Sequence, residues 1–133
     1  ILRGHEILDE IYKDFWKSPE LSALLGSPKT PAERGNKVRR SVTPLQYETA
    51  DKLNFLSIYI SSTTETTNIY VTRAFFTVDF YCKSITDMNK MIDLVGDILL
   101  NRDILCENQH GIASETKGVY RYRMIFRPLI WSQ

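Results

Sequence analysis

Apolar residues recur at helical spacing in several parts of the chain. Within residues 4–17 they fall at i, i+1, i+4, i+5, i+8 and i+9, which predicts an amphipathic helix with a wide apolar stripe. In "SPELSALLG", Ser18 suits an N-cap, Pro19 the first helical position and Gly26 the position after the end, so a short second helix is expected. A capped helix with one apolar stripe is also predicted over residues 84–100.

Other segments alternate between apolar and polar side chains, as strands with one buried face do. Residues 54–62 and 69–82 flank a short polar turn, so they should pair as a hairpin. The segment 119–131, "VYRYRMIFRPLIW", places aromatic and aliphatic side chains on one parity. Its other parity carries Arg121, Arg123 and Arg127. This strand should therefore present an apolar face and an arginine face.

Residues 27–53 have no clear period. Their prolines and the basic run "RGNKVRR" predict an extended basic loop or arm, in which "VRRSVTPLQY" could form a short strand. Ordering such a polar segment costs about 1 kcal/mol per residue, so we expect its centre, 34–40, to become ordered on assembly. Residues 101–118 are expected to form a second loop, with room for one short strand.

The predicted order is helix, helix, arm, strand, strand, helix, strand, within a single domain spanning 1–133. We expect an α+β fold, a two-layer sandwich whose mostly antiparallel sheet is covered on one face by the N-terminal and central helices. The other sheet face should be solvated in a monomer. It would carry Arg73, Asp79, Arg121, Arg123 and Arg127.

Composition is that of an ordinary globular domain, with 43% hydrophobic and 25% charged residues. No apolar run approaches the roughly 18 residues needed to cross a bilayer, and no signal-peptide pattern is present, so no membrane partner is expected. Cys82 and Cys106 are isolated from each other. They indicate a reducing compartment, such as a bacterial cytoplasm, rather than a disulfide framework.

Charge is unevenly distributed along the chain. Segments 27–44 and 117–131 each carry +4, whereas the remainder carries −7 and the whole chain +1. Such polarity suits head-to-tail self-association, in which one surface meets a different surface on the next copy, and it also suits anion binding. The candidate basic interface comprises Arg34, Lys37, Arg39, Arg40, Arg121, Arg123 and Arg127. The candidate acidic interface comprises Glu6, Asp9, Glu10, Asp87, Asp93 and Asp97.

Candidate catalytic residues are few. His5 and His110 have no acid or nucleophile at motif spacing, and Cys106 would need a positioned base. Asp93 and Asp97 lie one turn apart, but on the polar side of a helix. There is no phosphate loop, zinc spacing or GxSxG motif. We therefore predict a protein that is not an enzyme, with no catalytic, cofactor-binding or metal-binding residues.

The basic segments leave two interpretations open beside a merely solvated surface. They could contact an acidic neighbour, or they could form a nucleic-acid-binding module from the basic loop and the arginine strand. Base stacking needs aromatic and basic groups on the same face, and the alternation in 119–131 separates them. This weakens the nucleic-acid interpretation.

The element order resembles the tail-terminator and tail-completion (head–tail joining) proteins of long-tailed bacteriophages and prophages. "LSALLG" before a polar arm is similar to the early part of such proteins. So are the run "TRAFFTVDFYCKSITDMNKMIDLVGDIL" and the basic final strand.

This resemblance implies a non-enzymatic virion protein made in the bacterial host cytoplasm. It implies a homo-oligomeric ring, commonly a hexamer, at the head-proximal end of the tail, where it ends tube growth and joins tail to head. The implied partners are the tail-tube protein and a head-completion or connector protein. The arginines would meet acidic helix faces of a neighbour or face DNA passing through the lumen without sequence specificity, and we favour the first.

Overall fold

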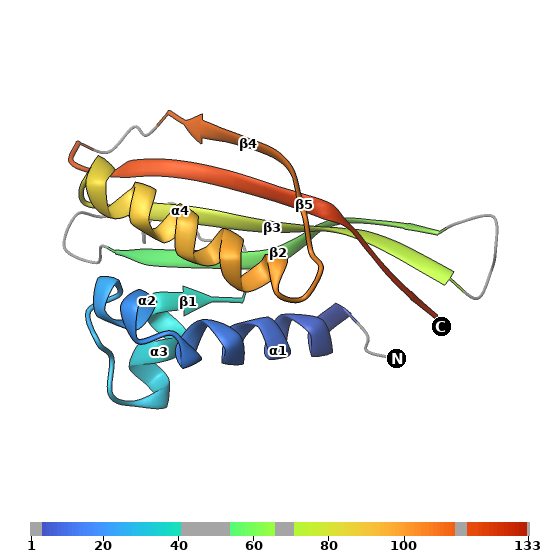
Figure 1. Cartoon of the computed structure of the whole chain (residues 1–133), viewed down its shortest axis with the longest axis horizontal. Coiled ribbons are helices and arrows are strands. Elements are labelled where there is room, and N and C mark those ends of the chain that lie inside the picture. The colour runs from blue at the N-terminus through green and yellow to red at the C-terminus, as the bar shows by residue number, and fades with distance from the viewer. Residues whose placement is uncertain (1–3, 41–53, 66–70, 114–116, 133) are drawn as a thin grey trace.

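The structure is a computed structural model that describes residues 4–40, 54–65, 71–113 and 117–132. The chain folds as an α+β domain, as predicted, in which helices pack on one face of a mixed five-stranded sheet (Figure 1). The elements in chain order are α1 (Gly4–Lys17), α2 (Pro19–Leu24), α3 (Pro31–Lys37), β1 (Val38–Arg39), β2 (Phe55–Glu65), β3 (Val71–Cys82), α4 (Ile85–Leu100), β4 (Cys106–Ile112) and β5 (Tyr120–Ser132).

Local signals explain the predicted helices. The Ser18 hydroxyl caps α2 by accepting a hydrogen bond from the Leu21 amide at 3.3 Å, with Pro19 at the first helical position. Gly26 follows with φ of +88°, a left-handed conformation that costs glycine least. Ser84 caps α4 by accepting from the Asp87 amide at 3.2 Å.

The strands follow the order β1-β2-β3-β5-β4 across the sheet. β1 is parallel to β2, and every other neighbouring pair is antiparallel, including the predicted β2–β3 hairpin. One sheet face packs against α1, α2 and α4 to form the main core, as the alternation predicts. Its fully buried members include Ile11, Phe15, Leu56, Ile58, Phe76, Val78, Phe80, Met91, Val95 and Phe126.

The opposite sheet face differs from the expectation of a solvated surface. Phe55, Ser57, Thr77, Asp79 and Tyr81 all point to this face, and none is more than 3% exposed. The wet-face prediction is therefore wrong for the middle of the sheet. The pattern of residue types concealed this because a serine, a threonine and an aspartate in alternating positions are typical of a solvated face.

The predicted arm is also partly wrong. Residues 31–37 form α3, capped by the Thr30 hydroxyl, which accepts from the Glu33 amide at 3.2 Å. Val38 and Arg39 then pair with Leu56 and Ser57, as the edge strand β1. The centre of the expected arm is thus part of the folded subunit, and residues 41–53 of it lie outside the described residues.

Candidate functional site

Arg123 on β5 lies against a buried carboxylate rather than facing solvent. Its Nε donates to Asp79 Oδ1 at 2.7 Å and its Nη2 to Asp79 Oδ2 at 3.3 Å. The antiparallel register places the two residues directly opposite each other on β3 and β5. The side chain of Asp79 is only 2% exposed, so the pair is buried at the carboxylate end and partly open at the guanidinium.

Tyr59 completes this cluster from β2. Its hydroxyl donates to Asp79 Oδ2 at 2.9 Å. Burial, then the charge of Asp79 and this hydrogen bond, raise the pKa of Tyr59 to about 12, so the phenol stays a donor at neutral pH. The hydrogen bond to Asp79 likewise raises the pKa of Arg123.

Arg121 lies two residues earlier on the same face. Its guanidinium carbon is 4.7 Å from the centroid of the Tyr81 ring, and its Nη2 donates to the Tyr81 hydroxyl at 3.1 Å. Tyr81 in turn stacks on Phe55, with ring centroids 4.5 Å apart. Both arginines therefore rest on β3, in contacts within one chain.

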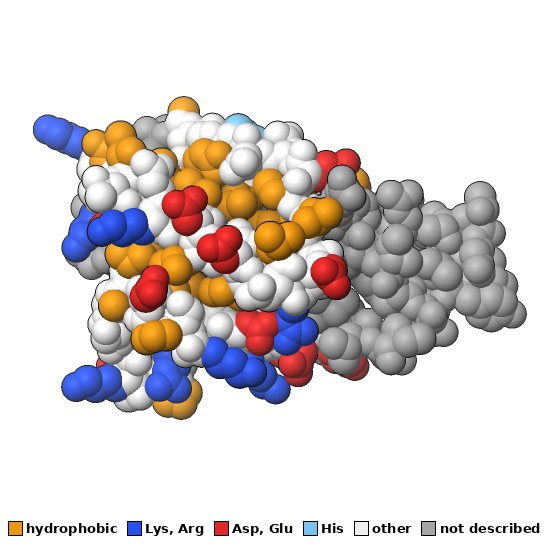
Figure 2. Space-filling model, in the orientation of Figure 1, with side chains coloured by type: hydrophobic (Ala, Val, Ile, Leu, Met, Phe, Trp, Pro, Cys, Tyr) orange, Lys and Arg blue, Asp and Glu red, His pale blue; other side chains and the backbone are white. Residues whose placement is uncertain are grey.

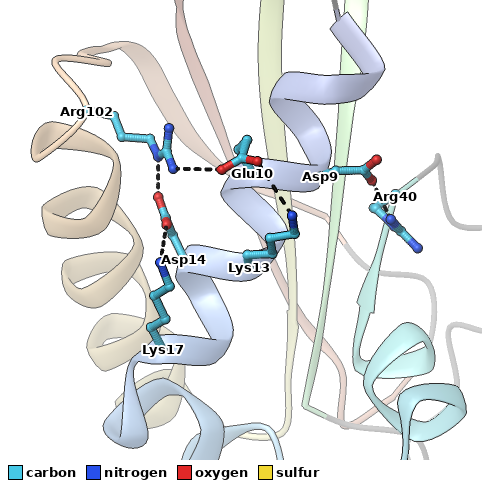
Figure 3. Close-up of polar contacts among 7 residues, drawn as sticks. All are labelled: Asp9, Glu10, Lys13, Asp14, Lys17, Arg40 and Arg102. Atoms are coloured by element: carbon cyan, nitrogen blue, oxygen red, sulfur yellow. Dashed lines mark hydrogen bonds and ion pairs between the residues drawn. The ribbon is translucent and has the colours of Figure 1, made fainter. Parts of the chain in front are cut away.

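Arg40 follows β1 and contacts α1 instead of extending away from the subunit. It forms an ion pair with Asp9 (Figure 3), and its guanidinium carbon lies 4.6 Å from the centroid of the Tyr12 ring. A basic residue of the arm and an acidic residue of the first helix are thus joined within one molecule. The two residues were expected on complementary interfaces of neighbouring copies, not in contact within one subunit.

Two further acids of α1, Glu10 and Asp14, are paired in the same way (Figure 3). Glu10 lies 3.6 Å from Lys13 Nζ and 3.5 Å from Arg102 Nη2, and Asp14 forms an ion pair with Arg102 and lies 3.8 Å from Lys17 Nζ. The hydrogen bond from Arg102 holds the pKa of the Asp14 carboxyl below its ordinary value. Sequence reasoning missed Arg102, because no local pattern connects the end of α4 with a helix 88 residues earlier.

Asp87 has a structural role within the fold. Its Oδ2 accepts from Asn54 Nδ2 at 3.2 Å, and the same amide nitrogen donates to the Leu24 carbonyl at 3.0 Å. The Asn54 oxygen accepts from the Lys83 amide at 2.8 Å. Asn54 is 4% exposed and links α2, α4 and the end of β3, so Asp87 supports this junction.

The other candidate residues differ in exposure. Arg34, Asp93 and Asp97 are exposed and form no ion pair among the residues that the structure describes. Glu6, Lys37 and Arg39 are half-buried, and burial, followed by the nearby charge of Lys83, lowers the pKa of Lys37. The side chain of Arg127 lies outside the described part.

The register brings together residues that the sequence places far apart. Arg39 pairs with Ser57, Ser57 with Asp79, Asp79 with Arg123, and Arg123 with His110, in one row across the sheet. Paired residues share a face, so Arg39, Arg121 and Arg123 lie on the same side. Asp9 and Arg40 do not belong to separate complementary surfaces, because they are paired with each other, and Glu10 and Asp14 are paired with other basic residues of the same chain.

The described residues offer little chemistry beyond charge. No group of three or more His, Cys, Asp or Glu side chains within the described ranges could hold a metal ion. A hollow of about 430 Å³ is lined by Asp14, Lys17, Ser18, Ile98, Asn101 and Arg102, and another of about 490 Å³ by Glu20, Ala23, Leu24, Lys90, Asp93 and Leu94. None of these lining residues is a histidine or cysteine that could pair as nucleophile and base.

A search for membrane spans finds no helix of sufficient length and apolar character within the described residues.

Comparison with known proteins gives one kind of match. Neither the models of known families nor the curated proteins match this chain. Among solved structures, the chain is similar to a chain from the virion of a native gene transfer agent particle, with a TM-score of 0.66 and 14% sequence identity. The similarity covers 92% of each chain. At this identity the likeness shows a shared fold, extending over nearly the whole of both chains.

Proposed function

We propose that this chain is a non-enzymatic structural subunit of a phage-like particle. The observation that carries the proposal is the fold likeness to a chain of a gene transfer agent virion over 92% of both chains. A likeness of that extent involves the whole domain rather than a common supersecondary motif.

Within the particle, we place the chain at the head-proximal end of the tail. There it would form an oligomeric ring that ends growth of the tail tube and joins the tail to the head, through contacts with a tail-tube protein and a head-completion or connector protein. The resemblance of the element order to tail-terminator and tail-completion proteins supports this assignment. The uneven charge of the chain supports it independently, since a ring joins unlike surfaces of successive copies.

Tail length in particles that lack the chain tests this function. If the ring ends tube growth, deleting its gene from the particle genome should give tails of unregulated length without heads, visible by negative-stain electron microscopy. Supplying the wild-type chain from a plasmid should restore tails of uniform length joined to heads. Tails of normal length carrying heads in the deletion strain would contradict the proposal.

A further inference from the structure

Large apolar side chains that remain exposed gather on one side of the molecule. Within the described ranges they are Ile85 (54% exposed), Leu100 (52%), Tyr120 (43%) and Leu105 (39%). Figure 2 shows apolar side chains grouped over α4 and beside it. Single exposed apolar residues need no explanation, but a group of them around α4 and β4 marks an interaction surface.

Helix geometry places these residues beside β5 and β4. Ile85, Ile92, Gly96 and Leu100 are spaced by seven, four and four residues, so they share one flank of α4. A Cβ at Gly96 would lie 3.9 Å from Met124 on β5, which identifies this flank as the one turned toward β5. The opposite flank, with Leu94, lines the hollow beside α2.

β4 continues this surface beyond the helices. It forms the edge of the sheet, and all its residues from Cys106 to Gly111 are exposed. Gln109 and Gly111 pair with Met124 and Tyr122, so they share the sheet face that the helices cover elsewhere. We call the region the α4–β4 surface; it comprises Ile85, Ile92, Leu100, Leu105, Tyr120 and Tyr122.

Acidic side chains border the α4–β4 surface. Asp93 and Asp97 follow the outer side of α4, next to the apolar flank, and both are exposed. Asp103 in the turn after α4 and Glu107 on β4 are exposed as well. Red side chains accordingly lie among and beside the apolar ones in Figure 2. The surface thus suits an occupant that combines apolar groups with cations.

The opposite edge of the same sheet combines exposed apolar groups with cations. β1 ends the strand order at the edge remote from β4, and α3 precedes it directly. Around α3, Lys29, Pro31, Ala32 and Arg34 are all exposed. The carboxylate of Glu33, the one acid from 27 to 40, accepts from the Lys29 backbone amide at 3.1 Å.

We propose that the α4–β4 surface of one copy binds the α3–β1 edge of the next copy, by apolar contact and by pairing of Lys29 and Arg34 with Asp93 and Asp97. The inference rests on the proposed function and specifies its subunit contact. Opposite charges at opposite edges of one sheet make the contact heterologous, so that each copy offers one edge and receives the other. This arrangement produces rings when the rotation between copies closes.

Sedimentation of the purified full chain over a range of protein concentrations tests the contact. Wild-type chain should self-associate, more strongly at low salt, because exposed charges are screened least there. Replacing Asp93→Lys together with Asp97→Lys should weaken association by about tenfold or more. Leu105→Glu should act in the same direction by removing apolar contact. Lys13→Glu, a charge reversal at an exposed position on α1 outside both proposed edges, is the control and should associate like wild type.

Charge exchange gives the decisive result. A Lys29→Glu, Arg34→Glu chain should also fail to self-associate, whereas an equal mixture with the Asp93→Lys, Asp97→Lys chain should associate again, in alternation. Thermal melts of each variant confirm that the chain is folded. Wild-type chain that stays monomeric at every concentration, or variants that associate like wild type, would overturn this inference. Neither result bears on the tail-length experiment, so failure of the contact and failure of the proposed function are distinguishable.

Discussion

Asp79 illustrates how a single polar residue depends on partners that only the register supplies. The side chain is 2% exposed, yet its carboxylate is satisfied by Arg123 and Tyr59 from the two neighbouring strands. In the sequence it looks like a solvated strand residue, since a strand that alternates gives no indication of which residue will lie opposite. The arginine parity of β5 was predicted, whereas its partners required the pairing of β3 with β5.

Removing Arg123 should therefore cost far more than removing Arg121. Arg123→Ala leaves a buried carboxylate without its cation, and we expect the free energy of unfolding to fall by about 3 kcal/mol. Arg121→Ala removes a stacking contact and one hydrogen bond to Tyr81, for an expected loss of about 1 kcal/mol. Urea unfolding of the two variants measures both values. Equal losses would contradict the assignment of Arg123 as the cation of a buried pair.

The Asp14–Arg102 ion pair should make the stability of the folded chain depend on pH. Arg102 holds the pKa of Asp14 down in the folded chain, so near its unfolded pKa of about 3.9 the folded state binds fewer protons. Its stabilising contribution is then fully present above that pH and is lost as the pH falls through the lower folded pKa. Asp14→Asn should lower the melting temperature at neutral pH, and its difference from wild type should shrink in acid. Glu20→Gln, at an exposed site without an ion pair among the described residues, is the control expected to change the melting temperature much less at neutral pH.

At the scale of elements, periodicity predicted those that bury a stripe or a face. α1, α4, β2, β3 and β5 all have one, whereas α2 was predicted from its capping residues. It did not predict α3, because "PAERGNK" contains no apolar stripe and the helix has no buried residue. For β4, the sequence predicted at most one short strand within a loop. The segment "CENQHGI" is exposed on both faces, so its apolar and polar residues do not alternate. Elements that contribute no core residues are held by tertiary pairing, which local sequence does not report.

Residues 31–39 form α3 and β1, so Arg34 stays exposed on α3 whereas Arg40, which follows β1, contacts α1; the two arginines should therefore differ in their effect on stability. Arg40→Ser removes the pair with Asp9 and the contact with the Tyr12 ring, so we expect a loss of about 1 kcal/mol in the free energy of unfolding. Arg34→Ser, at an exposed position on α3, should change it by less than about 0.5 kcal/mol. Calorimetric melts compare them directly. If both substitutions were neutral, the contact between Arg40 and α1 would contribute nothing to stability.

At the scale of the whole molecule, the charge polarity read from the sequence is partly consumed within the subunit. Asp9, Glu10 and Asp14 are paired with basic residues of the same chain, and the exposed acids Asp93, Asp97 and Glu107 lie on α4 and β4. The sum of charges along the chain was readable from the sequence. How these charges divide between internal ion pairs and exposed surface could not be predicted, because Arg40 and Arg102 reach α1 from distant parts of the chain.

Ion pairs within the subunit also argue against the alternative function, a nucleic-acid-binding module. Arg40 and Arg123 are already neutralised by carboxylates, and each phosphate contact would have to displace one. We therefore expect duplex DNA binding to be weak at low salt, without the steep decline in affinity that release of many counterions produces. Fluorescence anisotropy across a salt series measures this slope. Tight binding with a steep slope would favour the nucleic-acid-binding module over the structural subunit.

The strand order has a consequence for how the sheet comes apart. β4 is attached through β5, so β4 can fray alone, whereas β5 cannot detach from β3 without carrying β4 along. Amide hydrogen exchange should therefore proceed from β4 inward, with β3 the slowest. A neighbouring copy seated over β4 would convert the loosest strand of the free subunit into an interior one. Incorporation into a ring would then slow exchange at a strand that contributes almost nothing to the core of the subunit itself.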